Sequence, residues 1–148
     1  MIQNEKYEEA IELLNKSKQW PENLGVGKPF KPDERIADYL IGFANSKLNN
    51  EKEAETYWQT CANFTKDHLQ QASLNHILGL QSIAKLDGQE EARSTMKALL
   101  DSVHGKSPNI QWIATYFNQT KETLAQEDMK SGLVESDSHK LLLAILNL

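Results

Sequence analysis

One stretch near the start of the chain, residues 34–58, limits the folds that this sequence can adopt. Apolar side chains recur there at the three- and four-residue spacing of an amphipathic helix, on both sides of the polar pair Asn49 and Asn50. The apolar sets are Ile36, Tyr39, Leu40, Phe43 and Leu48, then Ala54, Tyr57, Trp58 and Cys61. The stretch therefore predicts two amphipathic helices that form a hairpin, with the asparagine pair as its turn.

Two small residues predict how closely these two helices pack. Gly42 lies inside the first predicted helix and Ala54 inside the second. Because neither residue carries a bulky side chain, we expect them to face each other and to let the two backbones approach closely.

The rest of the chain repeats the helical pattern, and strand-like alternation is missing from the sequence. Further helices are predicted over residues 5–19, 67–86, 89–104, 109–118 and 121–130, and Ser136–Ser138 caps a last helix. A single hairpin cannot bury both of its faces, so the pairs must stack. The predicted fold is all-α: an irregular right-handed stack of antiparallel helix pairs, an α-solenoid, forming a single domain over residues 1–148.

A long connection, residues 20–35, separates the first predicted helix from the hairpin. Loops of this length often carry function. Its aromatic content indicates an ordered segment, so we expect Trp20 and Phe30 to anchor it on neighbouring helices. A ligand site in the loop is the alternative.

The run Gly25–Lys28 has a superficial likeness to a phosphate-binding loop. Glu22 stands where that motif needs its first glycine, and Pro29 stands where it needs serine or threonine. No predicted strand precedes the run. The phosphate-loop interpretation is therefore excluded.

Charge and composition exclude several classes of partner. The chain has 148 residues and a formal net charge of −5, and acidic and basic residues are mixed along its whole length. Nucleic-acid grooves and anionic membrane surfaces both call for clustered lysine and arginine. We therefore expect neither a nucleic-acid nor a membrane partner, and we expect a cytoplasmic location.

The residues that could carry chemistry do not form a recognisable site. Cys61 is the single cysteine, on the apolar side of a predicted helix, and is better explained as a small buried hydrophobe than as a nucleophile. A site built from Cys61, Asp67 and His68 has unusual spacing and is less favoured. The four histidines, at positions 68, 76, 104 and 139, lack metal-ligand spacing. We therefore expect no catalytic residue, no metal and no cofactor.

An internal repeat supports the stacked arrangement. Leu86, Gly88, Glu91 and Ala92 echo Leu48, Asn50, Glu53 and Ala54 at matching spacing. Helix pairs with small residues at such fixed positions resemble the tetratricopeptide repeat, whose framework is matched here by Gly42, Ala54 and Trp58. The separations between repeats are longer than the usual period of about 34 residues.

The segment from Tyr7 to Gly42, with Trp20–Pro29 as its most distinctive part, resembles the repeat region of large multidomain bacterial proteins. Those proteins pair a domain of unknown function with tetratricopeptide-like repeats. The resemblance implies a helical-repeat fold and a place within a longer chain. It also implies that the helix of residues 5–19 is the second half of a hairpin that begins before Met1.

The expected function is a scaffold for protein–protein interaction, without catalysis of its own. In such stacks the first helix of each pair lines the concave side. The residues expected to bind a protein or peptide partner, or a neighbouring domain of the same chain, are Tyr39, Phe43, Lys47, Gln81, Lys85 and Trp112. Two alternatives stay open: a structural spacer, and a helper region for an enzyme domain elsewhere in the chain, possibly one acting on carbohydrate.

Two aromatic side chains, Trp112 and Tyr116, lie off the apolar stripe of their predicted helix. Exposed aromatic residues are enriched at binding surfaces. A helix buried on two sides by its neighbours explains the same pattern equally well.

The last predicted helix is apolar on almost every side, from Leu141 to Leu146. The end helix of a stack normally carries a polar outer face. We therefore expect its apolar surface to be covered by a continuing chain or by a second copy. The predicted homodimer contacts are Leu142, Ile145 and Leu146.

Overall fold

A computed structural model describes residues 2–19, 29–118 and 136–148, and in these ranges the chain forms helices and no strand. The helices are α1 (Ile2–Ser17), α2 (Arg35–Lys47), α3 (Glu51–Asp67), α4 (His76–Asp87), α5 (Gln89–Ser102), α6 (Pro108–Asn118) and α8 (Asp137–Leu146). The all-α prediction is thus confirmed for this part of the chain. The helix predicted over 121–130, and Trp20 with the rest of 20–28, lie outside the described residues.

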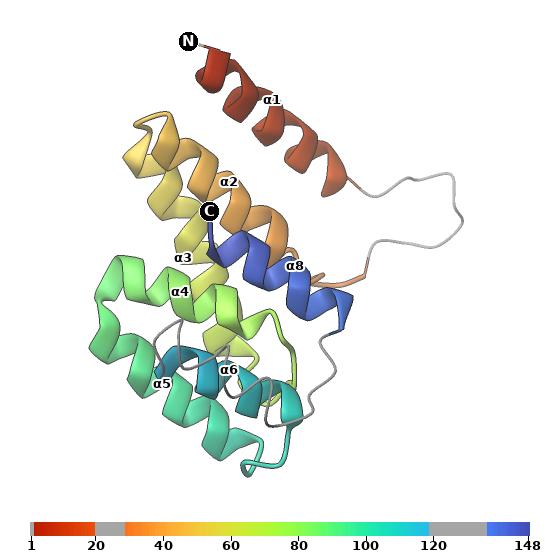
Figure 1. Ribbon diagram of the computed structural model, residues 1–148, viewed down its shortest axis with the longest axis vertical. Coiled ribbons are helices and arrows are strands. Elements are labelled where there is room, and N and C mark those ends of the chain that lie inside the picture. The colour runs from red at the N-terminus through yellow and green to blue at the C-terminus, as the bar shows by residue number, and fades with distance from the viewer. Residues whose placement is uncertain (1, 20–28, 119–135) are drawn as a thin grey trace.

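Consecutive helices pack on one another from α1 to α6, and α2 also contacts α4 (Figure 1). The most extensive contacts join α2 to α3 and α3 to α4. One large apolar cluster runs through these contacts and includes side chains of every helix from α2 to α6 together with α8.

The central hairpin forms as predicted, with its turn at Asn49, whose φ of 61° is left-handed. The Asn45 carbonyl accepts hydrogen bonds from the amides of Leu48 and Asn50 and so closes the turn. Ala54 is fully buried, as expected. The nearest neighbour of Gly42 is instead the Trp58 ring, because a Cβ on Gly42 would lie 2.6 Å from the indole Nε1.

The next hairpin, α4–α5, repeats this design. Gly88 lies between its two helices with a φ of 93°, and Ala92 is fully buried one turn into α5, as Ala54 is in α3. The Ala92 amide donates to the Gly88 carbonyl, just as the Ala54 amide donates to the Asn50 carbonyl. The internal repeat seen in the sequence therefore corresponds to a structural repeat.

The prediction that one helix runs from Asp67 to Leu86 was wrong. Asp67 ends α3, and α4 begins only at His76. Stacking of the His68 ring on Phe64, with ring centroids 4.0 Å apart, closes the end of α3. Residues 68–75 form a connection between the two helices, and the His76 side chain is fully buried.

The end of the long connection also differs from its prediction. Phe30 is 93% exposed and does not anchor the segment on a neighbouring helix. Lys31, which follows it, has a φ of 51° and places its ammonium group over the Phe30 ring. Phe30 therefore points to solvent beside its own chain neighbour.

A glycine that the sequence did not single out brings α3 and α4 together. A Cβ on Gly79 would lie 1.8 Å from Oγ1 of Thr65 and 3.1 Å from the Cys61 carbonyl oxygen. Both partners belong to α3, so Gly79 sets the distance between the two helix backbones.

We expect Gly79→Ala to destabilise the chain. Alanine favours a helix over glycine by about 1 kcal/mol, but overpacking a close contact typically costs roughly 1–3 kcal/mol. The free energy of unfolding in denaturant should therefore fall, whereas Ser94→Ala, at an exposed position of α5, should leave it unchanged. An unfolding midpoint for Gly79→Ala at or above the wild-type value would show that α3 and α4 separate without cost.

Candidate functional site

The last helix, α8 (Figure 1), shares one apolar cluster with α2 and α6. At its start, the His139 ring meets Trp112 of α6 edge-on, with centroids 4.7 Å apart. Just past its end, Leu148 lines a groove together with side chains of α1 and α2. α8 therefore spans the distance from α6 back to the α1–α2 pair.

We define the docking face as five side chains of α2 and α6 that share one apolar cluster with the inward side chains of α8: Ile36, Tyr39, Leu40, Trp112 and Tyr116. Trp112 and Tyr116 stack with centroids 6.0 Å apart. Burial, with Cys61 and Tyr116 nearby, raises the pKa of Tyr39 to about 12. The docking face is thus apolar, and its one buried phenol stays protonated.

The sequence of α8 explains how it begins and which side faces inward. Ser136 caps the helix by accepting from the His139 amide, and the His139 side chain accepts from the Ser136 amide in return. Leu142 is 1% exposed and Ile145 is buried one turn later, whereas Leu141 is 51% exposed. α8 is therefore amphipathic in its contacts, although its sequence is apolar on almost every side.

This burial corrects the predicted homodimer contacts. Leu142 and Ile145 pack inside the same chain, and the half-buried Leu146 packs against the same cluster. Burial within the chain thus takes the place of the contacts expected for Leu142 and Ile145 with a second copy, while Leu141 stays exposed.

The predicted partner-binding residues divide into buried and accessible groups. Tyr39 and Trp112 are buried, so neither offers a free surface, and for Trp112 the burial alternative is confirmed. Phe43 and Gln81 are half-buried, and Lys47 and Lys85 are exposed. The two lysines place their ammonium groups over aromatic rings: Lys47 over Phe43, and Lys85 over Trp58.

Beyond the end of α8 the apolar surface continues as an open groove of about 470 Å³ between α1 and α2. It is lined by Tyr7, Ala10, Leu13, Leu14, Leu40, Phe43, Ala44 and Leu148. Tyr7 meets Phe43 edge-on, with centroids 6.3 Å apart. Leu13 and Leu148 are 58% and 64% exposed, so the groove leaves large apolar side chains in contact with water.

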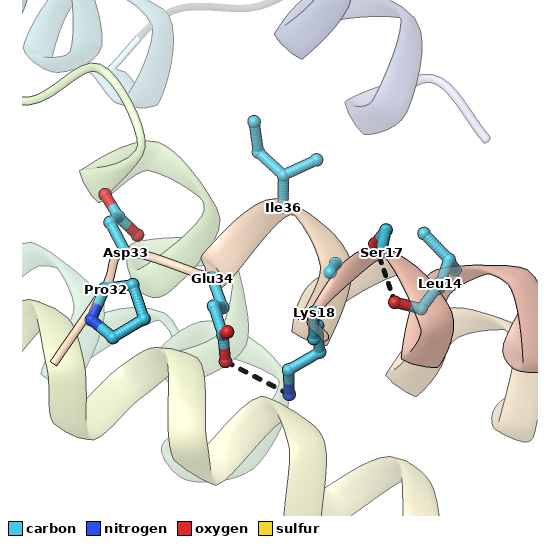
Figure 2. Close-up of a pocket in the computed structure, with 8 residues that line it drawn as sticks. Leu14, Ser17, Lys18, Pro32, Asp33, Glu34 and Ile36 are labelled. Carbon is cyan, nitrogen blue, oxygen red and sulfur yellow. Dashed lines mark hydrogen bonds and ion pairs between the residues drawn. The ribbon is translucent and has the colours of Figure 1, made fainter. Parts of the chain in front are cut away.

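A second hollow, of about 320 Å³, lies where the end of α1 meets the start of α2 (Figure 2). Lys18 sits at its wall, 2.5 Å from a carboxylate oxygen of Asp38 and 3.5 Å from one of Glu34. Burial raises the pKa of Asp38 even though the Lys18 charge acts in the opposite direction. These groups tie α1 to α2, and their arrangement resembles a structural ion pair more than a ligand site.

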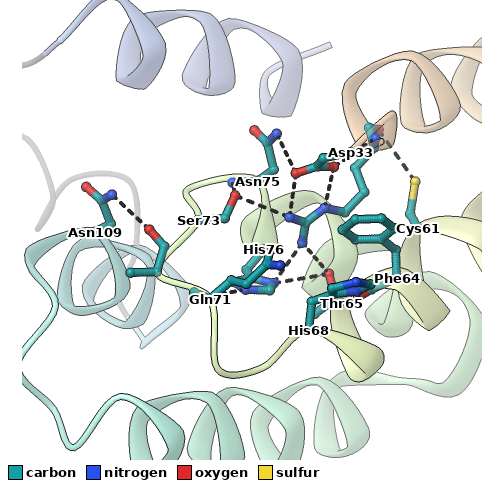
Figure 3. Close-up of polar contacts among 12 residues, drawn as sticks. Asp33, Cys61, Phe64, Thr65, His68, Gln71, Ser73, Asn75, His76 and Asn109 are labelled. Atoms are coloured by element: carbon teal, nitrogen blue, oxygen red, sulfur yellow. Dashed lines mark hydrogen bonds and ion pairs between the residues drawn. The ribbon is translucent and has the colours of Figure 1, made fainter. Parts of the chain in front are cut away.

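A buried polar cluster around Arg35 joins α2, α3 and α4. Figure 3 shows its members Asp33, Thr65 and His76. The Arg35 guanidinium is 2.7–2.8 Å from both carboxylate oxygens of Asp33. It also donates to Thr65 Oγ1 at 2.8 Å and, more weakly, to Ser73 Oγ at 3.2 Å. The Phe64 ring lies 4.8 Å from the guanidinium carbon. A charge that is almost fully buried is thus surrounded by partners from three segments.

His76 completes this cluster in its neutral form. Its Nε2 lies 2.9 Å from the Gln71 carbonyl oxygen, so this nitrogen carries the proton and donates. Its Nδ1 then accepts from Arg35 at 2.7 Å. Burial and the Arg35 charge lower the pKa of His76 from 6.5 to about 4. Burial alone would raise the pKa of Asp33, but hydrogen bonds and the charge of Arg35 outweigh it and lower this pKa.

The single cysteine is inert. Cys61 is fully buried and its thiol lies 3.5 Å from the Arg35 carbonyl oxygen. Burial raises the pKa of the Cys61 thiol to about 12, so the thiolate needed for nucleophilic attack does not form near neutral pH. Among the described residues, no group of three His, Cys, Asp or Glu side chains could hold a metal ion.

A scan against protein-family models, a search of curated proteins and a search of solved structures each found no match. Within the described ranges, no helix has the length and apolar content needed to cross a bilayer. Function therefore has to be inferred from the geometry of this chain.

We expect the stability of the chain to fall as the pH is lowered from about 6.5 to about 4. In this range the unfolded His76 binds a proton and the folded one does not, so the loss is complete near pH 4 and absent above pH 6.5. A shift of this size corresponds to a loss of up to about 3 kcal/mol.

The measurement is the free energy of unfolding as a function of pH. His76→Gln should flatten its slope between pH 6.5 and 5, because the amide can accept from Arg35 and donate to Gln71 without titrating. His104→Asn, at an exposed turn position, is the control and should keep the wild-type slope. Equal slopes for wild type and His76→Gln would contradict the assignment of a neutral buried His76.

Proposed function

We propose that this chain is a protein-interaction module that binds an apolar, helical segment of a partner protein. In this proposal the described helices form a tetratricopeptide-like stack, and the chain carries out no catalysis of its own. The observation that carries the proposal is the position of α8, a short amphipathic helix seated on the docking face.

The docking of α8 supports the proposal because it displays how a helix binds to this surface. Two side chains one turn apart, Leu142 and Ile145, enter the apolar cluster, and an aromatic ring, His139, rests on Trp112. Amphipathic helices that bind in grooves of partner proteins use anchors at this kind of spacing. The docking face therefore has the chemistry of a helix-binding surface.

The open groove between α1 and α2 also supports the proposed interaction function. Exposed apolar surface rimmed by polar residues marks interaction sites in soluble proteins. Here Leu13, Phe43 and Leu148 form such a surface, and Lys47 stands at its edge over the Phe43 ring. A partner segment would place apolar side chains in the groove and an acidic residue near Lys47.

We expect a selection from displayed random peptides of about 12–16 residues to enrich amphipathic helical sequences with apolar residues three or four positions apart. Leu13→Glu should abolish binding of the enriched peptides, because it places a charge in the apolar groove. Ser94→Glu adds the same charge at an exposed position of α5 and should leave binding unchanged.

Peptides that bind wild type and Leu13→Glu equally well would place their site elsewhere. A selection that enriches no common pattern would contradict the proposed function.

A further inference from the structure

We propose that α8 is an intramolecular occupant of the site on which the proposed function rests, and that the partner is an amphipathic helix with the apolar spacing of α8. In the described state α8 then holds the docking face closed. Binding of the partner requires α8 to leave.

The first argument is the continuity of the surface. The docking face and the open groove share Leu40, and the Leu148 side chain that follows α8 forms one wall of the groove. A helix that entered the groove between α1 and α2 and extended toward α6 would run along the path that α8 takes. The two helices could not both be accommodated on the docking face.

The second argument is the modest set of contacts that joins α8 to the other described helices. Its backbone makes none of the extensive helix–helix contacts that link α1 through α6. Only Leu142 and Ile145 among its side chains are buried. Leu141 and Ala144 face solvent. An element with few buried apolar contacts opens at a lower free energy than the core helices do.

The third argument is the contact between the His139 ring of α8 and the aromatic rings of α6. His139 lies edge-on to Trp112, and Trp112 stacks on Tyr116. The partner helix would therefore carry an aromatic or histidine ring three residues before its first apolar anchor, as His139 precedes Leu142. This spacing distinguishes the proposed partner from other amphipathic helices.

The test uses a fluorescein-labelled peptide of residues 136–148 as the probe and the full chain as the receptor. Leu142→Ala in the chain should weaken docking of α8, and Leu141→Ala is the matched control at the neighbouring, exposed position. Truncating a buried leucine changes a binding equilibrium by at least roughly thirtyfold. The apparent affinity for the probe rises with the fraction of open chain.

We expect weak binding of the probe to the wild-type chain, at least roughly thirtyfold tighter binding to Leu142→Ala, and wild-type binding to Leu141→Ala. A probe that itself carries Leu142→Ala should not bind. Equal binding to wild type and Leu142→Ala, or binding to neither, would overturn the inference.

A measurement on the wild-type chain covers the case in which Leu142→Ala fails to fold. Saturating unlabelled probe should speed hydrogen exchange of the α8 amides in the isotopically labelled chain and leave α3 and α4 unchanged. Unaltered exchange in α8 would overturn the inference. A further outcome is that selected peptides still require Leu13 for binding while the α8 probe does not compete with them. In that case the proposed function stands, and only the inference that α8 occupies the partner site fails.

Discussion

The junction of α2, α3 and α4 depends on the buried guanidinium of Arg35. Taking this charge out of water is costly, and only well-placed partners offset the cost. Asp33 supplies the opposite charge, while Thr65, Ser73 and His76 accept the remaining hydrogen bonds. Arg35 also fixes these partners, because without its guanidinium the Thr65 hydroxyl and the neutral His76 imidazole would lose this donor, and Asp33 would keep only Asn75 and a backbone amide. The cluster therefore acts as a unit that specifies one arrangement of three segments.

This junction places the surface to which we assign function. Thr65 accepts a hydrogen bond from Arg35 on one side and lies directly against Gly79 on the other. The polar cluster and the close approach of α3 and α4 are therefore coupled. α2 begins at Arg35, and the next turns of α2 carry Ile36, Tyr39 and Leu40 to the docking face. The orientation of the docking face toward α8 thus follows from a polar contact at the start of α2.

Local patterns predicted the hairpins well, because Asn49, Gly88, Ala54 and Ala92 act through the backbone and packing of their own neighbours. They could not predict the Arg35 cluster, since Thr65 and His76 lie 30 and 41 positions away and nothing in the local sequence indicates that they converge. Asp67 was mistaken for a helix start because aspartate is a common cap, although here it ends α3. For α8, the apolar pattern indicated that something covers Leu142 but could not distinguish a second copy from the same chain.

The most direct test of this account compares Arg35→Met with Arg93→Met by denaturant unfolding. Arg93 is an exposed helical arginine paired with Glu90, so its replacement should change the free energy of unfolding by less than about 1 kcal/mol. Replacing Arg35 leaves the buried acceptors Thr65 Oγ1 and His76 Nδ1 without their donor and should cost roughly 1–3 kcal/mol for each. Similar small losses for the two variants would contradict the claim that the Arg35 cluster holds the three helices in place.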